Sequence, residues 1–142
     1  MRRFWLLFSV LLAAAWTPAG AKVRLPAVVG DNMVLQQRSD VKFWGEAAPG
    51  RTVRITTSWD GRSYETAADA SGRWALKLPT GEAGGPYTVT VSDGKEVVLD
   101  NVMLGEVWVC SGQSNMEFML KEASTSRMDI PQSDNNNIRL LD

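Results

Sequence analysis

The sequence predicts a mostly β domain, followed by the beginning of a second domain that combines strand and helix. Apolar and polar residues alternate over several short stretches between residues 41 and 99, which is the period of a half-buried strand. Turn-forming residues separate these stretches at intervals of about 8–12 residues, as in a β-sandwich or a small barrel. Near residue 104 the pattern changes to a continuous apolar run followed by good helix formers, which is typical of an α/β unit.

The first 21 residues predict an export signal. Two arginines follow Met1, the stretch from Phe4 to Trp16 is almost wholly apolar, and Ala19-Gly20-Ala21 matches the small-residue pattern of a cleavage site. The apolar stretch is shorter than the roughly 20 residues that span a bilayer. We therefore expect cleavage near Ala21, a secreted or periplasmic mature protein, and no membrane attachment after signal removal.

Alternation places the strands of the β domain. We expect turns at Asp60-Gly61 and Asp93-Gly94, because Asp-Gly between extended runs is a strong hairpin signal, and a loop over residues 79–86. The aromatic side chains in these strands are expected in the core, with a sugar-binding site as the alternative; they are Phe43, Trp44, Trp74 and Tyr87. The predicted strands cover residues 41–44, 53–59, 64–68, 74–78, 87–91 and 97–99.

Composition excludes several classes of function. The chain has 15 Lys and Arg against 16 Asp and Glu, a near-neutral balance that argues against nucleic acid as a partner. It has one cysteine, Cys110, and no histidine, so we expect no internal disulfide, no metal site and no cofactor. Cys110 ends an apolar run and is expected in the core.

The segment after residue 104 contains a candidate nucleophile. The run Val107 to Cys110 predicts a strand buried on both faces, and Met116 to Ala123 predicts a helix. Ser114 lies between them, after Gly112, where a tight turn can present a hydroxyl beside the free N–H groups of a helix start. The alternative interpretation is an ordinary helix cap, since Ser and Asn are favoured there.

Several blocks of sequence resemble one enzyme family. Residues 105–116 (GEVWVCSGQSNM) closely resemble the nucleophile block of the sialate O-acetylesterases, which are carbohydrate esterases of the SGNH/GDSL hydrolase superfamily. The resemblance continues in residues 30–36 (GDNMVLQ), 41–45 (VKFWG), 84–87 (GGPY) and 137–139 (NIR), and runs from about residue 23 to residue 142. Ile138 to Leu141 also looks like the beginning of another strand.

This resemblance implies an all-β, jelly-roll-like sandwich over residues 22–103, after the signal over 1–21, and the truncated start of a flavodoxin-like SGNH hydrolase domain over 104–142. It implies that Ser114 attacks the acetyl carbonyl and that its backbone N–H is one oxyanion donor. Gly112, Gln113 and Asn115 would lie beside the substrate. The family's catalytic Asp and His are not in this chain, which has no His, so we expect the chain alone to be inactive. The implied partner is an acetylated sugar, either sialic acid or another plant or host glycan.

Two other classes stay open. One is a secreted, non-catalytic β-sandwich that binds carbohydrate, and the other is an interaction module that covers another subunit. The acidic side chains around the block, such as Glu106 and Glu117, are expected to be solvated surface charges. Nothing in the sequence predicts the oligomeric state.

Overall fold

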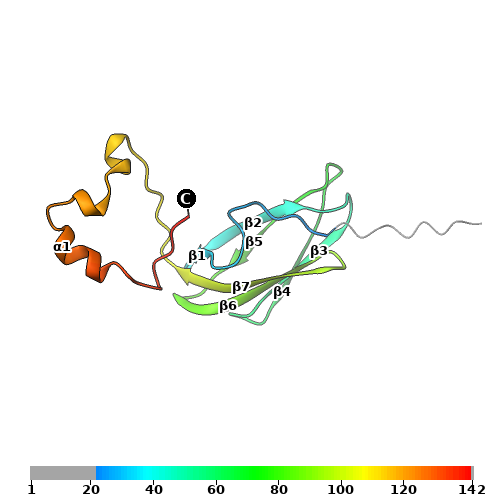
Figure 1. Cartoon of the computed structure of the whole chain (residues 1–142). Helices are drawn as coiled ribbons and strands as arrows, with labels where there is room; N and C mark the ends of the chain where they lie inside the picture. The colour runs from blue at the N-terminus through cyan, green and yellow to red at the C-terminus, as the bar shows by residue number, and fades with distance from the viewer. Residues whose placement is uncertain (1–21, 142) are drawn as a thin grey trace, which may run out of the picture.

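The structure is a computed structural model that describes residues 22–141. The predicted export signal over residues 1–21 lies outside this range. The described part divides into a body of strands and a C-terminal segment that leaves the end of the last strand (Figure 1). No helix among these residues has both the length and the apolar character needed to cross a membrane.

Between residues 22 and 141, seven strands form two sheets. The larger sheet has the order β1-β7-β6-β3-β4, and the smaller one pairs β2 with β5. All neighbouring strands are antiparallel except β1 and β7, which run parallel with Leu35 opposite Leu104. The strands are β1 (Val34–Gln36), β2 (Asp40–Glu46), β3 (Thr52–Thr57), β4 (Ser63–Ala67), β5 (Arg73–Pro79), β6 (Gly84–Ser92) and β7 (Glu96–Gly105).

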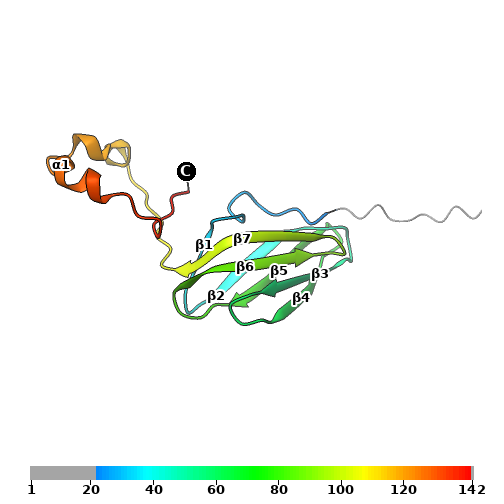
Figure 2. The same cartoon turned by 60° about the horizontal axis from the view of Figure 1, so that its bottom comes forward.

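One apolar core joins the two sheets. The larger sheet is curled, and β2 and β5 lie against it (Figure 2). Phe43 and Leu78 from the smaller sheet, and Ile55, Val89 and Val102 from the larger one, have no exposed surface and belong to a single cluster. The inward positions are every second residue, as alternation predicts. The expectation of mostly β structure is therefore confirmed.

The strands predicted from alternation are all present. β2 to β7 each overlap a predicted stretch, although β6 begins at Gly84, inside the predicted loop. β1 was not predicted, because three residues are too few to show a period. It is held by the hydrogen bonds from Met103 N to Met33 O (3.0 Å) and from Gln37 N to Gly105 O (2.8 Å).

The hairpin between β3 and β4 is wider than an Asp-Gly pair alone predicts. It closes through the hydrogen bond from Thr57 N to Arg62 O (3.1 Å). The Asp60 carboxylate accepts hydrogen bonds from the Thr57 hydroxyl (2.5 Å) and from Arg62 N (3.0 Å). Gly61 has a φ of 66°, the left-handed conformation that glycine adopts at no steric cost. Both glycines of the two predicted Asp-Gly turns have a positive φ.

The predicted strand and helix of the second domain are wrong for the described residues. Val107 to Cys110 forms no strand, and Ile138 to Leu141 forms none either. In place of the helix over 116–123 there are two 3₁₀ turns, η1 (Ser114–Glu117) and η2 (Leu120–Glu122). A short helix, α1 (Ser126–Asp129), and a third turn, η3 (Ile130–Gln132), follow.

Missing packing partners explain both errors. A strand needs neighbours for its backbone groups, and no strand among residues 22–141 pairs with Val107 to Cys110. Short helices are marginal unless an apolar face packs against other structure, and Phe118 and Met119 are 57% and 56% exposed. Cys110 is likewise exposed and not in the core.

Candidate functional site

Ser114 begins a turn that stands clear of the sheets. It is the first residue of η1, and Gln113 precedes this turn in a non-helical conformation, with φ −108° and ψ −138°. The turn closes through the hydrogen bond from Met116 N to Gln113 O (2.9 Å). Among residues 22–141 the Ser114 side chain has no hydrogen-bond partner, and Ser114 is exposed. Its hydroxyl is therefore accessible to a ligand.

The residues on either side of Ser114 are uncharged and shape the turn. Gly112, Gln113 and Asn115 are all exposed. A Cβ on Gly112 would lie 3.0 Å from the Met116 Cγ, so a side chain there would require the flexible Met116 to move. Asn115 accepts a long backbone hydrogen bond from Phe118 N (3.3 Å). These residues form the turn, and their role toward a substrate stays a prediction.

The described residues supply no partner that would activate the Ser114 hydroxyl. The chain has no histidine, and no carboxylate between residues 22 and 141 is hydrogen-bonded to Ser114. Within the same range no group of three His, Cys, Asp or Glu residues is arranged to hold a metal ion.

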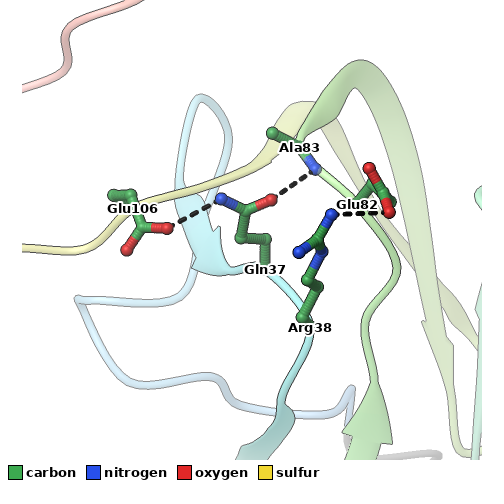
Figure 3. A network of polar contacts seen from close by, with 5 residues as sticks. All are labelled: Gln37, Arg38, Glu82, Ala83 and Glu106. Carbon is green, nitrogen blue, oxygen red and sulfur yellow. Dashed lines mark hydrogen bonds and ion pairs between the residues drawn. The ribbon is translucent and has the colours of Figure 1, made fainter.

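A junction of hydrogen bonds fixes the chain where it leaves β7 toward Ser114. The Glu106 carboxylate accepts hydrogen bonds from Gln37 Nε2 (2.7 Å) and Gln36 Nε2 (3.0 Å). Gln36 Oε1 in turn accepts from Val107 N (2.9 Å), and Gln37 Oε1 accepts from Ala83 N (2.8 Å). Figure 3 shows Gln37 between Glu106 and Ala83. The direction of the Ser114 segment is therefore set by side chains at the end of β1 and directly after it.

The same junction changes the acidity of Glu106. Hydrogen bonds from Gln36 and then Gln37 stabilise the carboxylate, and the positive charge of Arg38 adds to them, so that the pKa of Glu106 lies below its ordinary value despite an opposing effect of desolvation. Arg38 itself is held beside Ala83 by its ion pair with Glu82 (2.7 Å; Figure 3).

We expect low pH to weaken the junction. Because the pKa of Glu106 is lowered on folding, its contribution to stability is present above the pKa of an unfolded glutamate and is lost as pH falls through the lowered folded value. The side-chain amide signals of Gln37, followed by NMR, should titrate with a midpoint below the ordinary glutamate range. Glu106→Gln should abolish this titration, whereas Glu117→Gln should leave it unchanged. A midpoint at or above the ordinary glutamate value would contradict the prediction.

Arg139 attaches the C-terminal segment to the strand body through hydrogen bonds. Its guanidinium donates hydrogen bonds to the Asn101 backbone carbonyl, to Asn101 Oδ1 (3.0 Å) and to Met33 O (3.4 Å). Asn101 Nδ2 donates to Asn32 Oδ1 (2.7 Å), which ties the contact to the loop before β1. The last part of the chain accordingly lies beside the end of β7 (Figure 1). Both ends of the segment that carries Ser114 are thus attached around β1.

A groove of about 730 Å³ lies between this returning segment and the strand ends. Residues 133–139 form one wall, and Asn32, Pro86, Asn101 and Met103 contribute to the other. Ser114 does not line this groove.

The expected core aromatics divide into two groups. Phe43 is fully buried and Trp74 is 3% exposed, with their ring centroids 6.4 Å apart, so both are core residues as predicted. Tyr87 is partly buried and meets the ring of Trp59 edge-on at 6.0 Å. For Trp44 the core prediction is wrong, because this side chain is 40% exposed on the outer side of β2.

Sequence reasoning missed the two attachments of the segment. Glu106 was expected to be a solvated charge; it is exposed, but both of its carboxylate oxygens are hydrogen-bonded. The role of Arg139 was not predicted. One signal is present in the sequence, since three blocks of the family resemblance, 30–36, 105–116 and 137–139, contain Asn32, Gln36, Glu106 and Arg139, which are among the bonded side chains.

Comparisons with known proteins identify relatives of this chain. It is 34% identical over 123 residues to the sialate O-acetylesterase of Pongo abelii and 32% identical over 122 residues to that of Homo sapiens; each match covers 79% of this chain and 23% of the relative. The mouse sialate O-acetylesterase is 28% identical over 131 residues, which are 85% of this chain and 24% of the relative. The chain thus spans about a quarter of the length of the curated relatives it matches. No family model matches the chain.

A solved structure supports the same relationship. The crystal structure of a novel carbohydrate acetylesterase from Xanthomonas citri superposes with a TM-score of 0.72 and 34% identity, over 80% of this chain and 26% of that one. Fold and comparison together relate the matched residues to the corresponding part of carbohydrate acetylesterases. Over these residues the chain resembles the sialate O-acetylesterase-like esterases.

Proposed function

We propose that this chain is the nucleophile-bearing part of a secreted carbohydrate acetylesterase. The observation that carries the proposal is the match of 79% of the chain to sialate O-acetylesterases, together with 34% identity and a TM-score of 0.72 to a carbohydrate acetylesterase. The substrate class is an O-acetylated sugar, either sialic acid or an acetylated plant or host glycan. Export depends on residues 1–21.

In the proposed reaction Ser114 Oγ attacks the acetyl carbonyl, and the Ser114 backbone N–H donates to the oxyanion that forms. The sugar oxygen leaves with a proton, and water then hydrolyses the acetyl-Ser114 ester to acetate. General-base assistance typically contributes about 10²–10⁴-fold, and each further oxyanion donor about 2.7–4 kcal/mol. These groups, a His with its Asp and the additional donors, belong to sequence outside this chain. We therefore propose that residues 1–142 alone have no useful esterase activity.

The proposal includes an architecture. The strands over residues 22–103 form a jelly-roll-like sandwich, and residues 104–142 are the first part of a flavodoxin-like SGNH domain. Support comes from the apolar surface of this segment: Trp108 is 83% exposed, Val109 91%, Phe118 57% and Ile138 65%. Large exposed apolar patches mark surfaces that pack against something else. The junction at Glu106 and the contact of Arg139 would hold such a domain against the strands.

The test begins with the nucleotide sequence beyond codon 142. An open frame that carries an Asp-x-x-His block is expected, and its product should release acetate from an O-acetylated sugar and from an aryl acetate. Ser114→Ala should lower kcat by about 10⁴–10⁶-fold, whereas Ser124→Ala, in an exposed stretch of the same segment, should keep the wild-type rate. A stop codon at position 143, or a rate insensitive to Ser114→Ala, would overturn the catalytic proposal.

A second candidate function is carbohydrate binding without catalysis. The exposed Trp44 beside a groove favours it. This function does not exclude the first, because the groove and Ser114 lie on different parts of the chain.

A further inference from the structure

The outer face of the β2–β5 sheet carries a row of polar side chains around one exposed aromatic ring. Alternate residues of β2 point away from the core, and Trp44 is in the middle of them, with Lys42 and Glu46 on either side. All three are exposed, whereas Phe43 between them is fully buried. The facing positions on β5 are Arg73, Ala75 and Lys77, which are also exposed.

Trp44 is placed to offer its ring to a ligand. Its partner directly across the strand pair is Ala75, whose methyl group is too small to cover an indole. The other indole rings of the strand body contact protein groups. Trp74 is 3% exposed in the core. The indole N–H of Trp59 donates to Pro79 O (3.1 Å), and its ring packs against Tyr87. The exposed indole of Trp44 is therefore not explained by packing.

A groove of about 550 Å³ adjoins this ring. Trp44, Ala75, Lys42 and Arg73 contribute to its lining from the outer face, and residues 24–26 close one side. This volume lies within the range of small-molecule sites, which is about 300–1,000 Å³. No residue of the segment 106–141 lines the groove, so it is separate from Ser114.

The acidic side chains around the groove have partners within the protein. Glu46 forms an ion pair with Arg24 (4.0 Å) and lies opposite Arg73. Asp69 Oδ1 accepts hydrogen bonds from Ser71 N (2.8 Å) and Arg73 N (2.9 Å). The carboxylates are thus already engaged by groups of the protein.

Two lysines share this outer face, Lys42 in the lining of the groove and Lys77 outside that lining. Lys42 and Lys77 lie directly opposite each other, an arrangement of like charges that is unfavourable in a strand pair. Neither forms an ion pair within residues 22–141. A carboxylate placed between the two ammonium groups would relieve their repulsion and form charge-assisted hydrogen bonds.

We propose that this face is a binding site for a carboxylate-bearing sugar. The apolar face of the pyranose ring lies on the Trp44 indole, its carboxylate lies between Lys42 and Lys77, and its hydroxyls face Arg73 and Glu46. No residue that lines the groove belongs to the Ser114 segment, and the proposal does not depend on the proposed chemistry of Ser114. It would hold an acidic glycan while acetyl groups elsewhere on that glycan are removed.

The experiment is an NMR titration of the chain with matched pairs of probes. The acidic probes are the methyl glycosides of N-acetylneuraminic acid and of glucuronic acid, and each is compared with its own methyl ester, which lacks the charge. We expect at least one acid to shift the Trp44 indole and Lys42 amide signals saturably. Its ester should bind about tenfold more weakly, and added salt should weaken binding of the acid but not of the ester.

Variants separate the ring from the charges. Trp44→Ala should abolish binding, while Trp108→Ala, which removes another exposed indole, should leave it intact. The double variant Lys42→Ala and Lys77→Ala should remove the preference for acid over ester, and Lys95→Ala, in the β6–β7 turn, should not. Unchanged dispersion of the core amide signals verifies that each variant is folded.

The proposal is overturned if neither acid shifts these signals, or if acid and ester bind equally well. It is also overturned if Trp44→Ala binds as the wild type does. The outcome is independent of the esterase assay, since binding is measured without Ser114 chemistry.

Discussion

Replacing Phe43 by alanine is expected to lower the free energy of unfolding by about 3–5 kcal/mol. Phe43 has no exposed surface and packs against Trp74, with the ring centroids 6.4 Å apart. It is also the largest fully buried side chain that the smaller sheet contributes to the core. Truncation would remove its burial and leave a cavity where the two sheets meet, because close-packed neighbours relax only in part.

Urea unfolding followed by tryptophan fluorescence measures this effect. Val98→Ala is the matched control, because Val98 is also in a strand of the body but is 48% exposed. It should change the free energy of unfolding by less than about 1 kcal/mol. If Phe43→Ala costs no more than the control does, the two sheets do not share the core described above.

Gly72→Ala is expected to have the second large effect on the free energy of unfolding, which it should lower. Gly72 has a φ of 82°, and a Cβ there would lie 2.7 Å from the backbone carbonyl oxygen of Ala47. The left-handed conformation alone costs a residue with a side chain about 1–2 kcal/mol. The collision adds to this, since a backbone oxygen cannot swing aside as a flexible side chain can. Ala47 is also held in place by the hydrogen bond from its N–H to Gly72 O (2.8 Å). We expect a total above about 2 kcal/mol.

Gly61→Ala is the control that separates the two contributions. Gly61 has a φ of 66°, but a Cβ there would meet nothing within 4 Å. It should therefore show the conformational cost without the collision, about 1 kcal/mol after the reduced entropy of the unfolded chain is counted. Equal losses in the two variants, measured by urea unfolding, would show that the Ala47 carbonyl moves away freely.

The strand body was predictable because its information is local. Val53 and Ile55 alternate with polar residues, and each inward position of that alternation is buried. Gly61 and Gly94 follow aspartates between extended runs, and both have a positive φ. A period of two and a turn residue are each visible within a few positions of sequence.

The candidate site was predictable in part. The block around Ser114 was recognised by resemblance, and the comparisons confirm the family. The prediction of a strand over Val107 to Cys110 is wrong, because an apolar stretch forms a strand only where a neighbouring strand pairs with it. The attachments through Glu106 and Arg139 link positions about 70 and 38 residues apart in the chain, and no local pattern reports such pairs.

By itself, therefore, the sequence determined the mostly β character, the positions of six strands, and the family to which the chain is related. The tertiary structure decided which strands are neighbours, that β1 joins β7 in parallel, and that Trp44 stays exposed while Phe43 beside it is buried. The physical reason is that alternation assigns a residue to one of two faces of a strand. Which face is covered, and by what, depends on contacts between residues far apart in the chain.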